Sequence, residues 1–122
     1  ERILLVGTRE WEHDEIRQRQ HILGLHHLTP EDAADSPAPV LDWIRSTGAS
    51  KLMVHFDLDA LDPRDLFAAV APVPHGLSLE NVIELINAIA DNFDLVALTI
   101  AEPMPTVAIR LRDMLSRLPL VR

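Results

Sequence analysis

Three short, continuous apolar runs predict strands at residues 3–6, 51–56 and 95–101. These runs lack the alternation of a strand with one face in water, so we expect strands buried on both faces, as in a parallel sheet. The second run leads into Asp57 and the third into Glu102. Two of the predicted strands therefore end in carboxylates.

Apolar residues at helical spacing predict four helices. The clearest begins after Ser78, a residue type that caps helix N-termini. Its apolar stripe consists of Leu79, Val82, Ile83, Ile86, Ile89, Ala90 and Phe93. A second helix is expected at 107–118, a shorter one at 40–44 closed by Gly48, and a weaker polar one at 12–23.

The order of these elements defines the expected fold class. Strand, helix, helix, strand, helix, strand, helix predicts an α/β domain with three αβα layers and a mostly parallel sheet. Residues 66–76, which contain Pro72 and Pro74, are expected to form a long irregular loop. The 122 residues suit a single domain, and 48% hydrophobic with 25% charged residues is the composition of a globular protein.

Charge and residue counts exclude several function classes. Eleven Lys and Arg against 19 Asp and Glu leave a net charge of −8, which argues against a nucleic-acid surface. The chain has no cysteine, so any metal must be held by oxygen or imidazole. No apolar run approaches the ~20 residues that span a bilayer, and no secretory signal is visible. We therefore expect no membrane partner and a cytoplasmic location.

The chemistry of the chain is concentrated after the second predicted strand. Alternation along an extended chain sends Asp57 and Asp59 to the same side, about 7 Å apart at ~3.3 Å per residue. Carboxylates at this separation repel each other unless a cation or a proton lies between them. Mn, Mg or Ca suits such oxygen ligands. Asp57 and Asp59 are equally compatible with a strand end that caps a turn, with Asp62 beginning that turn.

The segment HFDLDALDP at residues 55–63 resembles the S-x-D-x-D-x-x-D-P signature of the arginase/agmatinase family of manganese-dependent ureohydrolases. Four further segments resemble the family in the same order. They are VGTRE at 6–10, LTPED at 28–32, HGLS at 75–78 and AEP at 101–103. The resemblance thus extends along nearly the whole chain.

The resemblance implies a hydrolase that cleaves a guanidino or amidino C–N bond and releases urea, with a hydroxide bridging two Mn ions as nucleophile. Asp57 would bridge the two ions and Asp59 would chelate one of them. Glu102 would accept hydrogen bonds from the guanidinium of a small-molecule substrate, or else be a strand-end carboxylate in water. Glu10 and Glu12 correspond to positions that contact the far end of the substrate, although a solvated first helical turn also explains them.

The chain also departs from the family pattern. The family's G-G-D-H and D-A-H-x-D motifs, which supply most of the metal ligands, have no counterpart in these 122 residues. His55 replaces a serine and is either a group supporting the metal ligands or a buried, hydrogen-bonded core histidine; Asp62 is assigned the same supporting role. We therefore expect an incomplete, C-terminal part of an arginase-like domain, inactive by itself.

An incomplete domain has consequences for the sheet. In the family's sheet order, absent strands separate the first predicted strand from the other two. The sheet must then leave a gap, rearrange, or cover its edges by self-association, and we expect a homo-oligomer.

Three other functions remain open. The first is a catalytically inactive module that acts in self-association or partner binding, which the missing histidine motifs favour. The second is a paired-metal DNA polymerase, which the charge of −8 and the scarcity of aromatic residues disfavour. The third is an aspartyl phosphatase, which is disfavoured because Leu61 stands where that motif has Thr or Val and the glycine after it is missing.

Overall fold

The computed structural model describes residues 2–9, 14–104 and 108–121. Its helices and strands follow one another as β1 (Leu4–Val6), α1 (Asp14–Ile22), β2 (His26–Leu28), α2 (Pro30–Ala34), α3 (Ala38–Thr47), β3 (Lys51–Asp57), the 3₁₀ turn η1 (Leu58–Ala60), α4 (Leu79–Asn92), β4 (Asp94–Ala101) and α5 (Ala108–Ser116). The three predicted strands and four predicted helices are all present. Residues 66–76 are irregular, as expected.

The strands form two parallel pairs. Strand β1 pairs with β2, and β3 pairs with β4, from Lys51 opposite Asp94 to Asp57 opposite Ala101. In the part of the chain that the structure describes, these pairs are separate two-stranded sheets. Of the three expected solutions for an incomplete sheet, the described chain therefore shows the gap.

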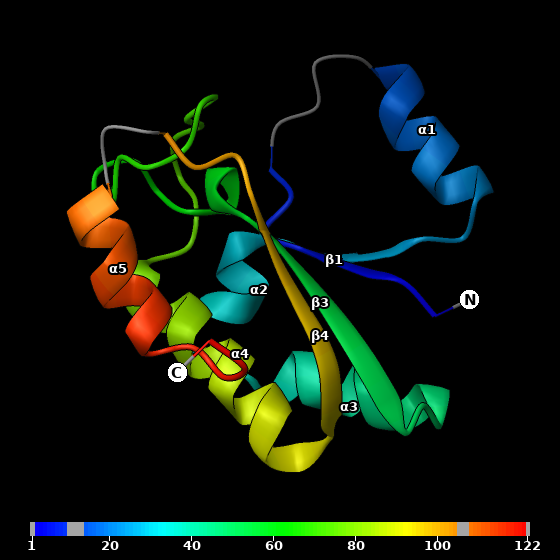
Figure 1. The fold of residues 1–122 in the computed structure, drawn as a ribbon. Coiled ribbons are helices and arrows are strands. Elements are labelled where there is room, and N and C mark those ends of the chain that lie inside the picture. Colours follow the sequence, from blue (N-terminus) through cyan, green and yellow to red (C-terminus); the bar gives the residue numbers. More distant parts are fainter. Residues whose placement is uncertain (1, 10–13, 105–107, 122) are drawn as a thin grey trace.

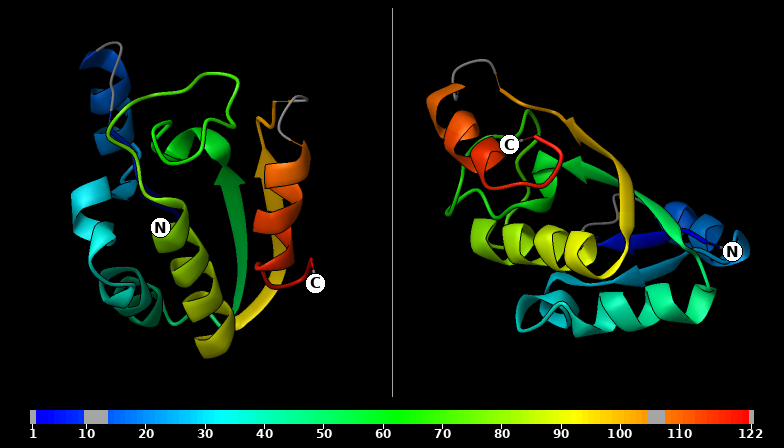
Figure 2. Two further views of the ribbon diagram at one scale, coloured as in Figure 1. Left: turned by 90° about the vertical axis from the view of Figure 1, so that its left-hand side faces the viewer. Right: turned by 60° about the horizontal axis from the view of Figure 1, so that its bottom comes forward.

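Helices lie on both sides of the strands. Helices α2 to α5 lie on one side, and α1 lies on the other, beside β1 and β2 (Figure 1). In Figure 2, left, α5 lies in front of β4, α4 lies beside β3, and α3 lies on the far side of α4. Helices thus flank parallel strands, as expected of an α/β domain, and the helix on the second side lies beside β1 and β2 only.

Helix α4 follows directly from its sequence. The Ser78 hydroxyl accepts a hydrogen bond from the Asn81 amide at 3.1 Å, which satisfies one of the free N–H groups of the first turn. The apolar stripe is buried, and the helix ends where Phe93 becomes extended, with φ −141°. Helix α3 ends at Gly48 in the left-handed conformation, as the sequence predicts.

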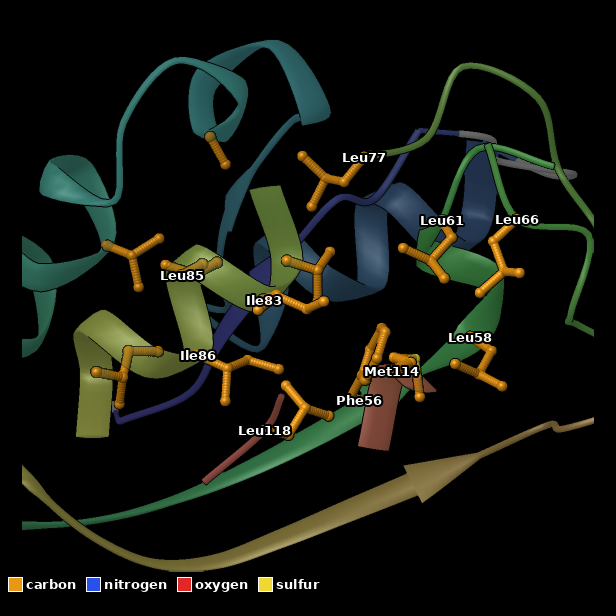
Figure 3. Close-up of a cluster of buried hydrophobic side chains, with 14 of the residues drawn as sticks. Phe56, Leu58, Leu61, Leu66, Leu77, Ile83, Leu85, Ile86, Met114 and Leu118 are labelled. Atoms are coloured by element: carbon orange, nitrogen blue, oxygen red, sulfur yellow. The ribbon is translucent and has the colours of Figure 1, made fainter. Parts of the chain in front are cut away.

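The core lies between α4, α5 and the inner face of β3 (Figure 3). Phe56 points into it from β3, and Met114 and Leu118 come from α5 and the residues after it. Met114 and Leu118 are 0% exposed. Each such side chain stabilises the fold by roughly 1.5–3 kcal/mol through burial, so the core anchors the inner side of the strands.

The structure corrects two expectations. Strands β3 and β4 are not buried on both faces: Met53 is 70% and Val96 53% exposed. Helices α4 and α5 cover one face of this pair, and no helix among the described residues covers the other. The sequence analysis also missed β2, because its three residues, of which two are histidines, show neither an apolar run nor alternation.

Candidate functional site

The carboxyl ends of β3 and β4 lie side by side. Asp57 is the last residue of β3 and pairs with Ala101, the last residue of β4, so that Glu102 follows at the same edge. Ligands of parallel α/β sheets bind beyond this edge, because loops and helix N-termini converge there. We call Asp57, Asp59 and Glu102 the acidic cluster.

Asp57 and Asp59 share one tight turn. The Asp57 carboxylate caps η1 by accepting a hydrogen bond from the Asp59 amide at 3.2 Å, and both residues are half-buried. The capping role that the sequence left open is therefore present. It occupies one oxygen of Asp57 and leaves the rest of the pair available for a ligand.

The Asp59 carboxyl is electrostatically crowded. Burial raises its pKa above the ordinary value, and the negative charges of Asp57 and Glu102 raise it further, while Arg9 opposes them. Repulsion of this kind is relieved by a proton or by a bound cation. Asp57 and Asp59 are therefore electrostatically coupled, whereas Glu102, which is exposed, has the smallest effect on Asp59.

Glu102 adopts an unusual backbone conformation. Its φ is 63°, in the left-handed region that costs a non-glycine residue about 1–3 kcal/mol. The loop holds it there: the Val70 amide donates to the Glu102 carbonyl at 3.2 Å, and the Met104 amide donates to Ala68 at 2.8 Å. Backbone strain that the surrounding structure maintains is common at functional sites, and the strained residue here directly follows the carboxyl end of β4.

The two candidate supporting residues face different partners. His55 is exposed, so the interpretation as a buried core histidine is wrong, although its Nδ1 lies 2.7 Å from the Thr99 hydroxyl. The reason is that His55 points to the uncovered face of β3. Asp62 is 5% exposed, and its carboxylate accepts hydrogen bonds from Arg64 and from the His75 amide. Arg64 holds the pKa of Asp62 well below its ordinary value.

Glu10 and Glu12 lie outside the described residues, so their predicted substrate contacts stay predictions. Among the residues that the structure describes, no three His, Cys, Asp or Glu side chains converge to hold a metal. The carboxylates of Asp57 and Asp59 thus suit a hard divalent cation in kind but are too few for a complete ligand set.

The sequence analysis gave Arg9 no role, yet its guanidinium joins the site to two other segments. It donates only to main-chain carbonyls in the described structure. The acceptors are Gly7, Asp59, Leu61, Val73 and Pro74, at 3.1, 2.6, 3.4, 2.5 and 2.9 Å. The only signal for Arg9 in the sequence was its place in the VGTRE segment, because its acceptors lie up to 65 residues away.

Two hollows lie away from the acidic cluster. One, of about 570 Å³, lies between α1 and the start of β2, and the other, of about 520 Å³, lies between Thr8, Thr29 and His75. Neither is lined by Asp57, Asp59 or Glu102. We place more weight on the strand ends, because the chemistry of the side chains gathers there.

Parallel strands, helices on both sides and carboxylates at adjacent strand ends define an αβα domain with an acidic cluster, and comparison with known proteins identifies its family. Residues 1–115 match the Arginase family profile. An arginase from Eremothecium gossypii is 30% identical over 111 residues, 88% of this chain and 28% of that protein. The chain belongs to the arginase family, a family of hydrolases.

Solved structures agree on the fold. Helicobacter pylori arginase superposes with a TM-score of 0.80 at 18% identity, over 93% of this chain and 41% of that one. Entamoeba histolytica arginase, solved in complex with L-ornithine, gives 0.78 at 24% identity, over 94% and 41%. The chain therefore has the fold of part of an arginase, and it spans less than half the length of these relatives.

No helix in the described ranges combines the length and the apolar character that crossing a membrane requires.

Proposed function

We propose that this chain carries part of the active site of a manganese-dependent ureohydrolase, which cleaves a C–N bond of a guanidino or amidino compound and releases urea. The observation that carries the proposal is that Asp57, Asp59 and Glu102 lie at two adjacent strand ends, where burial first, and the charges of Asp57 and Glu102 in addition, raise the pKa of Asp59. Membership of the arginase family supports it.

Asp57 and Asp59 are the proposed ligands of two Mn ions. When bound, the ions would lower the pKa of water at the site and so supply a nucleophile near neutral pH. Within this chain, the Asp57 carboxylate stabilises the turn, because it caps η1. Asp59 then faces Asp57 across a half-buried turn in which bulk water screens the two charges incompletely.

Glu102 is the proposed acceptor of the substrate guanidinium. A carboxylate binds a planar guanidinium through charge-assisted hydrogen bonds, which fix its orientation as well as its position. The loop contacts of Glu102 to Val70 hold its backbone in the left-handed conformation before any substrate arrives. Glu10 and Glu12 are proposed to contact the far end of the substrate.

The remaining metal ligands have to come from outside these 122 residues, since the G-G-D-H and D-A-H-x-D motifs are absent from the sequence. The curated relative is about three and a half times as long as the segment matched here, because that segment covers 28% of it. Two aspartates leave an ion mostly hydrated. We therefore expect weak Mn²⁺ binding and negligible turnover from this chain by itself.

The second candidate is a catalytically inactive module that associates with itself or with a partner. The uncovered face of β3 and β4, on which Met53 and Val96 are exposed, favours it. Exposed apolar groups of this kind are common where proteins bind one another. The homo-oligomer and the cytoplasmic location expected from the sequence also stay predictions.

Mn²⁺ titration of the 122-residue chain, followed by electron paramagnetic resonance, separates the two candidates. We expect saturable binding that weakens about tenfold or more in the Asp57→Asn/Asp59→Asn double variant. The Asp91→Asn/Asp94→Asn variant removes two exposed carboxylates elsewhere and is the matched control for charge. Equal Mn²⁺ affinity in both double variants would overturn the metal assignment and favour the inactive module.

A urea assay with Mn²⁺ and arginine or agmatine, together with a formamide assay with Mn²⁺ and formimidoylglutamate, tests the substrate class. The expected result for the isolated chain is no urea or formamide above background. Turnover that disappears in the Glu102→Gln variant would support the guanidinium contact and show that the histidine motifs are dispensable.

A further inference from the structure

Arg9 uses its guanidinium in an unusual way. An arginine side chain carries five N–H donors in a rigid fork, and charged partners usually attract them. The five acceptors of Arg9 are instead main-chain carbonyls from three segments: the residue after β1, the η1 turn, and the proline-containing loop. Arg9 therefore adds a side-chain connection to the main-chain hydrogen bonds by which Leu77 already joins the turn.

The loop needs such a donor. Its chain passes through Pro72 and Pro74, which have no N–H group to pair with neighbouring carbonyls. Main-chain carbonyls that lose contact with water require a hydrogen-bond partner from elsewhere. The Arg9 Nη2 atom serves this purpose for the part-buried Val73 carbonyl at 2.5 Å, and the Nε atom also reaches the Pro74 carbonyl at 2.9 Å, where the loop is exposed.

The same Nη2 atom reaches the turn that presents the acidic cluster. It lies 2.6 Å from the carbonyl oxygen of Asp59 and 3.4 Å from that of Leu61. The Nη2 atom of Arg9 thus links the η1 turn to the loop. A shift of Arg9 would change where the Asp59 side chain points.

We propose that Arg9 is a positioning residue: by holding the carbonyl oxygens of Asp59, Leu61 and the loop together, it fixes the turn in which Asp59 and Asp57 bind a divalent cation. The inference rests on the proposed function for the cation, whereas the clamp itself rests on the hydrogen bonds.

Charge and geometry predict opposite outcomes when Arg9 is replaced. If Arg9 were only a nearby positive charge, its removal would strengthen the binding of a cation by Asp57 and Asp59. If it positions the turn, its removal weakens that binding. Lysine keeps the charge but is a point donor on a flexible stem, so it cannot span three segments.

The experiment is a Mn²⁺ titration by electron paramagnetic resonance on the wild-type chain and on the Arg9→Gln, Arg9→Lys and Arg45→Gln variants. Arg45 lies on α3 and contacts Asp42 and Asn92, so its variant matches the loss of charge away from the site. We expect Kd for Mn²⁺ to rise about tenfold in both Arg9 variants, the usual effect of losing a group that orients metal ligands, and less than twofold in Arg45→Gln.

Amide hydrogen exchange provides a second readout, which does not involve the metal. The amides of Leu61 and Leu77 donate to Leu58 and Ala60 within and beside the turn, and in both Arg9 variants their exchange should accelerate by more than the change in global stability accounts for. Unchanged or tighter Mn²⁺ binding in Arg9→Gln, or wild-type affinity in Arg9→Lys, would overturn the inference. Absence of Mn²⁺ binding by the wild-type chain would refute the proposed function instead, and the exchange data would then decide whether Arg9 holds the turn.

Discussion

The contact between Gly76 and the η1 turn allows a quantitative prediction. A Cβ atom on Gly76 would lie 2.5 Å from the carbonyl carbon of Leu61 and 2.6 Å from both the Ala60 oxygen and the Asp62 nitrogen. Favourable contacts of carbon atoms begin at roughly 3.5 Å. All three neighbours are main-chain atoms of one turn, so they cannot rotate away as a side chain would.

The expected cost of Gly76→Ala has two parts. Overpacking of this kind costs roughly 1–3 kcal/mol. The shift also strains the two hydrogen bonds between Leu77 and the turn, from the Leu77 amide to Ala60 at 2.9 Å and from the Asp62 amide to Leu77 at 2.8 Å, each worth about 1 kcal/mol. Together these give a loss of about 3 kcal/mol in the free energy of unfolding, a large part of the stability of a small domain.

Urea denaturation followed by circular dichroism measures this loss. With a slope near 2 kcal/mol per molar, the midpoint should fall by about 1.5 M. Gly48→Ala is the matched control: Gly48 has φ 66°, but a Cβ atom there meets nothing within 4 Å, so only the conformational cost of about 1 kcal/mol applies. A Gly76→Ala protein within 0.5 kcal/mol of the wild type, a threshold set by the usual scatter of surface substitutions, would refute the reasoning.

Three further predictions concern charge and exposure. The raised pKa of Asp59 means that its ionisation destabilises the folded chain. Asp59→Asn should therefore raise the urea midpoint at pH 7, and this gain should disappear below about pH 4, where Asp59 is protonated. The lowered pKa of Asp62 means that its ionised form stabilises the folded chain; this stabilisation is present above about pH 4 and is lost as the pH falls further. Asp62→Asn should therefore lower the urea midpoint at pH 7 and lower it progressively less at acid pH, unlike the exposed control Asp91→Asn. Met53→Lys should leave the thermal midpoint within about 2 °C of the wild-type value, because Met53 is 70% exposed. The variant should reduce any concentration-dependent association seen by analytical ultracentrifugation, and unchanged association would exclude this face as the interface.

Much of the secondary structure was readable from the sequence. The α4 stripe and its Ser78 cap are local signals, since helical periodicity and a capping hydroxyl act over a few residues. The strand runs that end in Asp57 and Glu102 were equally visible. Family membership was also evident from the spacing of the 55–63 segment, and the Arginase family match confirms it.

The environment of each group depended on the tertiary structure. The short strand β2 exists because it pairs with β1, and its own three residues carry no strand pattern. His55 and Met53 are exposed because no described element packs on their face of β3, which an apolar run cannot reveal.

Asp57 and Asp59 show most clearly which features the sequence determines and which depend on the tertiary structure. The sequence by itself determined that two carboxylates leave one strand close together, because the chain geometry of a strand sets their spacing. Only the folded chain brings Arg9 to the carbonyl of Asp59, 50 residues away, and Gly76 against the same turn. Contacts across such separations come from the packing of whole elements, and local sequence patterns do not encode them.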